Sequence, residues 1–195
     1  MMNEEALHQY FRQVCDDNDQ DAYNELYKGL CSRLIHFSAA ITGSWHLAEE
    51  IVSDVFIMLW RKRAQLAGVA NPVVYLYVCT RNQSVNALRQ QRRHQHMSLD
   101  HLDTEAFAIS PDTEQNMLSA EVTQKIESAI RSLPTRCQLI FRLVKQDGLK
   151  YKEVGELLQI SPKTVDAQLA IAVKKIAEAI RLDMTADTAQ SYLFR

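Results

Sequence analysis

The stretch GLKYKEVGELLQISPKTVDAQLAIAVKKI, residues 148–176, contains two helical patterns separated by a very short turn. The first places Tyr151, Val154, Leu157 and Leu158 on one face, after a glycine, Gly148, that suits the end of an earlier helix. The second begins with Ser161, a typical N-cap, and Pro162, a residue favoured at the first helical position. Its apolar residues then form one narrow seam, Val165, Leu169, Ala172, Ile176 and Ile180. The stretch therefore predicts a helix-turn-helix.

The outward face of the second helix carries small and polar residues near its start and lysines further along. Such a face suits a helix that lies in the major groove of DNA. We predict Val165 to Lys175 as the recognition helix, and the candidate DNA-binding residues are Lys163, Thr164, Asp166, Ala167, Gln168, Ala170 and Lys174. Taken alone, the stretch also fits an ordinary helical hairpin at a protein surface.

The composition favours a helical protein without a membrane span. With 195 residues, 47% of them hydrophobic, the chain can form one or two domains with a substantial core. Five glycines and four prolines are too few for a strand-rich protein or for a glycine-rich phosphate loop. Apolar runs such as VFIMLW, residues 55–60, are too short to cross a bilayer, and the acidic start MMNEEALHQY does not resemble a signal peptide. We expect a cytoplasmic protein.

The sequence contains no established motif for a metal, a cofactor or a catalytic site, and its one group of possible metal ligands, His94, His96, His101, Asp100 and Asp103, lies in a segment that resembles a loop. The cysteines Cys15, Cys31, Cys79 and Cys137 are scattered, without a CxxC pair, which argues against a zinc knuckle and a disulfide framework. No nucleophile–base pair or set of paired acids with metal-ligand spacing is evident. We therefore expect neither a metal nor a cofactor, and no enzyme activity.

The net charge of −2 conceals a strong segregation of charge along the chain. Residues 1–60 hold ten acids and three bases, whereas residues 61–96 hold seven bases and no acid. Residues 97–124 hold six acids and no base, and residues 125–182 hold eleven bases and six acids. Two basic blocks separated by an acidic linker suggest two modules that face nucleic acid. Because the total charge is not basic, we expect weak binding to duplex DNA without a larger partner.

The segment WHLAEEIVSDVFIMLWRKR, residues 45–63, predicts a long helix with two distinct stripes. The core-facing stripe is Ala48, Ile51, Val52, Val55 and Leu59. The second stripe is Glu50, Ser53, Asp54, Ile57 and Arg61, which mixes acids with an apolar residue. This second stripe is either a docking surface or a solvated acidic face.

The segment LAGVANPVVYLYVCTRNQSVNALRQQRR, residues 66–93, predicts a loop followed by a helix. We expect the core side of this helix to be Val74, Val78, Val85 and Leu88. Another face carries an aromatic group, amides and guanidinium groups in one row, Tyr75, Cys79, Asn82, Asn86, Arg89 and Arg93. Such a row can stack on bases, hydrogen-bond their edges and hold phosphates of an exposed strand. A solvated basic helix end would account for Arg92 and Arg93 but less well for the amides.

These motifs together resemble the extracytoplasmic-function group of bacterial RNA polymerase sigma factors. AEEIVSDVFIMLW resembles the core-binding helix of that family, and NPVVYLYVCTRNQSVNALRQQRR resembles its promoter-melting and minus-ten helix. SLPTRCQLIFRLVKQDGLKYKEVGELLQISPKTVDAQLAIAVKKI resembles the C-terminal module with its minus-thirty-five helix-turn-helix. The resemblance implies an all-α protein with two small domains joined by a flexible acidic linker. It places a region 2-like domain at 1–95, the linker at 96–120, a region 4-like domain at 121–182 and a tail at 183–195.

The resemblance also implies roles for residues that match the family motifs. Glu50, Ser53 and Asp54, with Ile57 in the same stripe, are expected to bind core polymerase. The loop Leu66 to Pro72 is expected to capture a flipped minus-ten base, and the minus-ten residues would be Gly68, Asn71, Tyr75, Asn82, Asn86, Arg89, Arg92 and Arg93. On the recognition helix, Lys163, Asp166, Ala167 and Ala170 would face bases and Thr164 a phosphate. Expected partners are core polymerase, promoter DNA as duplex and melted strand, and an anti-sigma factor that masks the docking faces.

Several residues depart from the family pattern. Gln159 stands where many relatives have glycine, and a left-handed residue there would cost about 1 kcal/mol. Gly155 replaces the usual alanine, which permits a close helix crossing and lowers helix propensity by about 1 kcal/mol. Asn86 replaces a common aspartate, and Asp166 and Ala167 on the recognition helix do not indicate which bases they contact, so the promoter sequence is not readable from these residues.

Two other functions fit parts of the sequence. Similar SPKTV-type turns end many response-regulator-like transcription factors, but residues 1–95 show no alternating strands of a receiver or ligand domain. A helical adaptor or RNA-binding protein would share the basic blocks but would lack promoter specificity.

Overall fold

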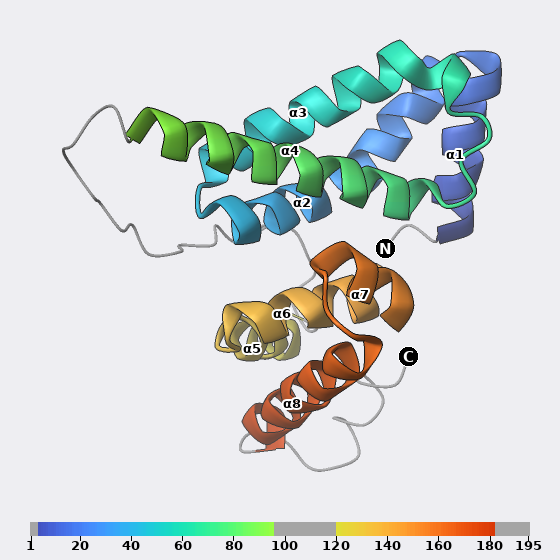
Figure 1. Ribbon diagram of the computed structural model, residues 1–195. Helices are drawn as coiled ribbons and strands as arrows, with labels where there is room; N and C mark the ends of the chain where they lie inside the picture. Colours follow the sequence, from blue (N-terminus) through green and yellow to red (C-terminus); the bar gives the residue numbers. More distant parts are fainter. Residues whose placement is uncertain (1–3, 96–119, 182–195) are drawn as a thin grey trace. The chain divides into compact units, whose positions relative to one another are not determined.

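The computed structural model describes residues 4–95 and 120–181, and every regular element in these ranges is helical (Figure 1). This confirms the all-α prediction. The chain forms two compact units, one within Met1–Ala108 and one within Ile109–Arg195. The predicted acidic linker lies outside the described residues except for its last residue, Ala120, where a helix begins, and the C-terminal tail lies wholly outside them. None of the described helices is long and apolar enough to span a membrane.

The first unit is a bundle of four helices around one apolar core. The elements are α1 (Glu4–Asp17), α2 (Gln20–Thr42), α3 (Trp45–Lys62), the 3-10 turn η1 (Arg63–Gln65) and α4 (Pro72–Gln95). α2 packs against each of the other three helices, and all four contribute fully buried residues: Leu7, Phe11, Leu26, Leu30, Leu34, Phe37, Val55, Leu59, Leu76 and Tyr77. Phe37 and Tyr77 meet edge to face, with ring centroids 5.0 Å apart. The long helix α2 therefore organises this unit.

Short polar caps set the ends of these helices. The Asp19 carboxylate accepts from the backbone N–H of Asp21 at 2.8 Å and of Ala22 at 3.0 Å, which begins α2. Gly43, in the left-handed region at φ 74°, ends α2, and the Ser44 hydroxyl then caps α3 through the N–H of Leu47. The turn between α2 and α3 is therefore closed by local hydrogen bonds.

The structure confirms the predicted core stripe of α3 and corrects that of α4. All five residues of the α3 stripe are buried, Ala48, Ile51, Val52, Val55 and Leu59. On α4 the buried side is instead Val73, Leu76, Tyr77, Thr80 and Ser84. The predicted core residues Val74, Val85 and Leu88 are only half-buried, and Val78 is 39% exposed.

The buried side of α4 differs from the prediction because two of its core residues are polar and have their hydroxyl groups hydrogen-bonded. The Thr80 hydroxyl donates to the carbonyl of Leu76, and the Ser84 hydroxyl donates to that of Thr80. Ser84 Oγ also lies 2.8 Å from Ser38 Oγ on α2. These bonds remove the penalty for burying the hydroxyl groups, and small side chains leave room for α2 beside α4.

The second unit contains the predicted helix-turn-helix. Its elements are α5 (Ala120–Arg131), α6 (Thr135–Phe141), the π-helical turn η2 (Arg142–Gln146), α7 (Tyr151–Leu158) and α8 (Pro162–Arg181). The α8 seam Val165, Leu169, Ala172 and Ile176 is buried, as predicted, whereas the side chain of Ile180 lies outside the described part. Gly148 follows η2 at φ 75°, and the N–H of Leu149 closes back on the carbonyl of Leu143 at 2.9 Å. An ion pair of 3.3 Å joins Arg142 to Glu127 of α5.

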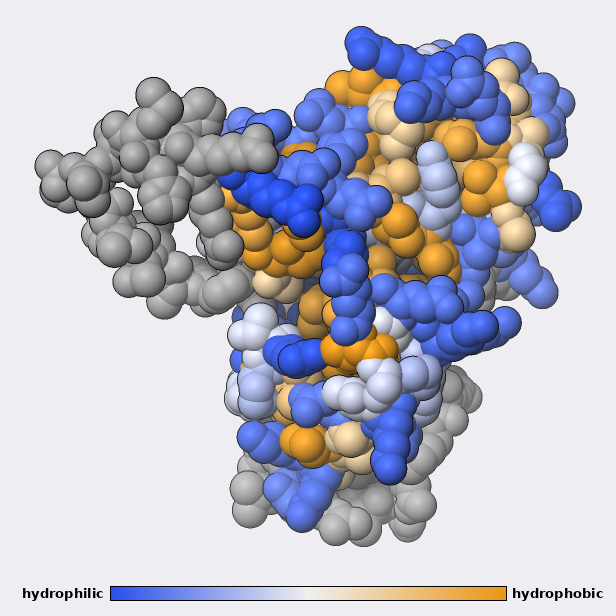
Figure 2. All heavy atoms as spheres, in the orientation of Figure 1, coloured by the Kyte–Doolittle hydropathy of each residue, from blue (hydrophilic) through white to orange (hydrophobic). Residues whose placement is uncertain are grey.

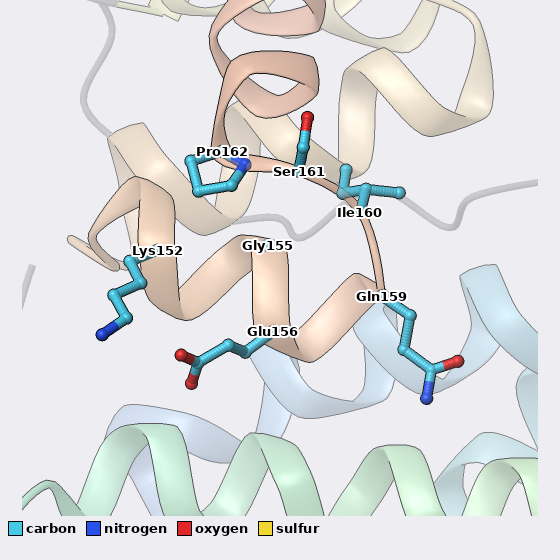
Figure 3. Close-up of a pocket in the computed structure, with 7 residues that line it drawn as sticks. All are labelled: Lys152, Gly155, Glu156, Gln159, Ile160, Ser161 and Pro162. Atoms are coloured by element: carbon cyan, nitrogen blue, oxygen red, sulfur yellow. The ribbon is translucent and has the colours of Figure 1, made fainter.

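Figure 3 shows the turn between α7 and α8 with the residues that line it. Backbone hydrogen bonds hold this turn. Gln159 occupies the left-handed region at φ 55° and ψ 48°, as predicted, and the N–H of Ile160 donates to the carbonyl of Gly155 at 2.9 Å. The Ser161 hydroxyl caps α8 by accepting from the N–H of Thr164 at 3.1 Å. A Cβ at Gly155 would lie 2.8 Å from the Ile160 carbonyl oxygen, so its close contact is with the turn. Tyr151, expected on the inward face of α7, is 39% exposed.

Replacing Gln159 by glycine should stabilise the second unit. The exposed side chain of Gln159 points away from the turn in Figure 3, so little packing is lost. Glycine removes the left-handed penalty of the folded state, but it also adds freedom to the unfolded chain, which offsets part of that effect. The free energy of unfolding should therefore rise by roughly 0.5–1 kcal/mol. Urea unfolding followed by circular dichroism would measure it. Gln159→Ala is the matched control, which should give no gain, and an equal gain from alanine would contradict the backbone explanation.

Candidate nucleic-acid and protein interfaces

The predicted docking stripe lies on one exposed face of α3. Glu50, Ser53, Asp54 and Ile57, here called the acidic face, are all exposed, and 46% of the Ile57 surface is accessible. Glu50 lies 3.5 Å from His46, and the Ser53 hydroxyl donates to the backbone carbonyl of Glu49. Asp54 forms no ion pair with the residues that the structure describes. The face thus combines acidic groups with one exposed apolar side chain.

Aromatic packing explains how α3 is held with this face outward. Phe56 and Trp60 lie against α2, where the Tyr23 ring is 5.1 Å from that of Trp60 and the Tyr27 ring 4.8 Å from that of Phe56. The apolar run at residues 55–60 is therefore shared between the core, α2 and the exposed face. Tyr27 itself is 39% exposed, and a hydrogen bond with Cys31, with burial, raises its pKa to about 12. Tyr27 is not among the predicted site residues, although its one-turn spacing from Tyr23 on α2 could have indicated it.

The loop between α3 and α4 is anchored at both ends. Arg63 stacks over the Trp60 ring at 4.3 Å, and its Nε donates to Oδ1 of Asn18 at 2.6 Å. Leu66 is buried, and Asn71 caps α4 by accepting from the N–H of Val74 at 3.1 Å. Between these anchors Gly68 is exposed, and no atom lies within 4 Å of where its Cβ would be. The predicted minus-ten residue Asn71 therefore has a structural role, while Gly68 leaves open space.

The exposed face of α4 brings together most of the predicted strand-binding row. Asn82, Asn86 and Arg89 are exposed, and Tyr75 is half-buried. Burial and a hydrogen bond with Cys79 raise the pKa of Tyr75 to about 12, so its hydroxyl remains protonated at neutral pH. Exposed Val78 lies beside this row, and apolar residues lie among hydrophilic ones over the first unit in Figure 2. Arg92 and Arg93 belong to α4, but their side chains lie outside the described part.

The outward face of α8 gathers the predicted duplex-binding residues. Lys163, Ala167, Ala170 and Lys174, here called the outer row, are exposed at helical spacing, and Asp166 is exposed beside them. Lys174 lies 3.9 Å from Glu178, and Ile171 is 43% exposed. Two predicted residues are set back from this row. Thr164 is half-buried with its hydroxyl 2.8 Å from that of Ser161, and half-buried Gln168 accepts from the Cys137 thiol of α6 at 2.9 Å.

Among residues 4–95 and 120–181, no group of three histidine, cysteine or acidic side chains could hold a metal ion. The exposed faces of α3, α4 and α8 carry groups that are suited to binding. They offer carboxylates with an apolar group on α3, amides with a guanidinium on α4, and ammonium groups with small side chains on α8.

Two protein-family models match the chain in the order of the two units. The model described as sigma-70 region 2 matches residues 21–94, and the model described as sigma-70, region 4 matches residues 123–176. The first match spans the acidic face, the loop and most of α4. The second spans the helix-turn-helix and its outer row. Together they cover more than half of the 195 residues.

Curated relatives and solved structures agree with this assignment. The chain is 24% identical over 187 residues to the ECF RNA polymerase sigma-E factor of Escherichia coli K12, covering 92% of this chain and 97% of that protein. It is 27% identical over 157 residues to the probable RNA polymerase sigma factor RfaY of Xanthomonas campestris pv. campestris, covering 78% of this chain but only 39% of that protein. The sigma factor RpoE of Bartonella quintana, solved with the anti-sigma factor NepR, shares the fold with a TM-score of 0.58 at 18% identity, over 83% of this chain and 98% of that chain. The chain therefore belongs to the sigma-70 family of RNA polymerase sigma factors and resembles the members of its extracytoplasmic-function group.

Proposed function

We propose that this protein binds core RNA polymerase, directs it to specific promoters, recognises the minus-thirty-five element and helps to open the minus-ten element. The observation that carries the proposal is the set of three exposed helical surfaces, on α3, α4 and α8, each backed by a buried stripe. The polymerase performs the catalysis, and the protein contributes binding and selection. Such a factor would work in the cytoplasm, where polymerase and promoters meet.

The acidic face of α3 is the proposed contact with core polymerase. An exposed isoleucine surrounded by carboxylates can bury apolar area while the charges select a basic partner surface. An anti-sigma factor that covers this face would keep the protein idle, which makes such a factor a second proposed partner. The solved relative from Bartonella quintana is itself bound to an anti-sigma factor.

Reversing the charge at Asp54 should weaken core binding at least tenfold, because a buried like-charge contact costs several kcal/mol. The Asp54 side chain is exposed, so the variant Asp54→Arg should fold normally. Pull-down with purified core polymerase measures the loss. Asp16→Arg, at an exposed position of α1, is the matched control and should bind as the wild type does. Unchanged core binding by Asp54→Arg would show that the docking face lies elsewhere.

The exposed loop around Gly68 and the row on α4 are the proposed site for the opening strand. Unstacking a base costs a few kcal/mol, and a preformed surface that holds the base can offset that cost. The open space at Gly68 permits the close approach of a nucleotide, and Asn82, Asn86 and Arg89 supply hydrogen-bond donors further along α4.

Arg89→Ala should therefore reduce promoter opening more than duplex binding. The guanidinium would hold a phosphate or a base of the melted strand, so its loss should lower permanganate reactivity of minus-ten thymines about tenfold or more, corresponding to one hydrogen bond from a charged group. Gln90→Ala, an exposed change on the same helix, should leave opening intact. If Arg89→Ala impaired duplex binding and left opening unchanged, the strand-holding role would be wrong.

The outer row of α8 is the proposed reader of the upstream element. Run-off transcription with core polymerase on a genomic DNA library should produce new discrete start sites that share an upstream motif.

Lys163→Ala should alter the preferred motif, because a lysine near base edges contributes about 1–3 kcal/mol of discrimination. A library in which Lys163→Ala changes nothing that depends on sequence would favour a nucleic-acid-binding adaptor without promoter specificity.

A further inference from the structure

One hydrogen bond joins a buried thiol of α6 to the side of α8. Cys137 is only 4% exposed, and its Sγ donates to Oε1 of Gln168 over 2.9 Å. Gln168 is half-buried, so one end of its amide faces α6. The contact links residues 31 positions apart in the sequence and ties α8 to a neighbouring helix by a polar group.

This bond determines which end of the amide can serve a ligand. A glutamine amide has one acceptor end, Oε1, and one donor end, Nε2, with two N–H groups. Oε1 accepts the thiol proton with one of its two lone pairs, and both N–H groups of Nε2 stay available to an external partner. Bidentate recognition of adenine needs both ends of the amide, whereas a phosphate oxygen needs only a donor. The N–H groups of Gln168 are thus suited to donate to a phosphate of the DNA backbone.

The position of Gln168 on α8 agrees with this assignment. Gln168 follows Thr164 by one turn and precedes exposed Lys175 by two turns, so the three residues form a row along one side of the helix. This row lies between the buried seam and the outer row. When a helix lies in the major groove, residues at the side of its base-facing surface meet the sugar–phosphate backbone.

We propose that Cys137 is a positioning residue, whose thiol orients the amide of Gln168 so that Nε2 donates to one phosphate of the upstream element. The bond would fix the register of α8 in the groove. This inference rests on the proposed duplex binding by α8, and it assigns Gln168 to the backbone and gives a role in recognition to a buried residue of another helix.

The test uses holoenzyme formed from the full chain and core polymerase, on a promoter duplex from the library selection. Each phosphate of the upstream element is replaced in turn by a neutral methylphosphonate. Cys137→Ala and Gln168→Leu should each weaken binding about tenfold, as expected for the loss of one hydrogen bond to a charged phosphate oxygen. The double variant should bind no more weakly than Gln168→Leu alone. One methylphosphonate position that weakens wild-type binding should have no further effect on either variant.

Matched variants separate this role from general stability. Cys137→Ser retains a donor and should recover most of the binding lost in Cys137→Ala, while thermal unfolding checks that each variant is folded at the assay temperature. Gln168→Leu should leave the preferred motif unchanged, and it should leave the salt dependence unchanged because a neutral amide releases no counterion.

The proposal would be overturned if the double variant lost as much binding as the two single variants together. It would also be overturned if both variants responded to every methylphosphonate as the wild type does. A changed base preference in Gln168→Leu would place Gln168 on a base edge and would also overturn it. If Lys163→Ala and every methylphosphonate were without effect, the proposed function of α8 would fail together with this inference.

Discussion

Each long helix of this protein must bury one stripe completely so that the opposite stripe can be offered to a partner. In α8 the seam from Val165 to Ile176 is closed against its own unit, and this fixes the rotation of the helix about its axis. Rotation by two residues, about 200°, would replace the outer row by the apolar seam. The same constraint holds α3, where Val55 and Leu59 on one side leave Asp54 and Ile57 on the other.

The caps determine where each helix begins, and the aromatic contacts hold α3 beside α2. The apolar stripes alone determine neither. A stripe sets how a helix is rotated, but its starting point depends on local bonds such as those made by Asp19, Ser44 and Ser161. Edge-to-face contacts from Tyr23 and Tyr27 then hold α3 beside α2. Neutral and local interactions thus place the charged and amide groups of the surfaces.

The sequence predicted α3, α8 and the turn before α8 well, because strong apolar periodicity and typical capping residues coincide there. The prediction was wrong for the buried side of α4, because the spacing of apolar residues there indicated Val74 and Val78 as core residues. Hydropathy cannot anticipate that Thr80 and Ser84 become acceptable core residues once they bond to carbonyls of their own helix. It also cannot show that Arg63 is used in stacking on Trp60, or that Gln168 turns toward α6, since both depend on contacts between segments distant in sequence.

The tyrosine–cysteine pairs of α2 and α4 have a consequence for the chemical durability of the protein. Cys31 and Cys79 each follow by one turn a tyrosine with which they share a hydrogen bond, and burial raises the pKa of both thiols. Because the thiolate is the reactive form of cysteine, few of these side chains are ionised at neutral pH. Cys15 and Cys137 are buried outright. We therefore expect all four thiols to react slowly with oxidants and alkylating agents, because two of them are buried and the pKa of the other two is raised.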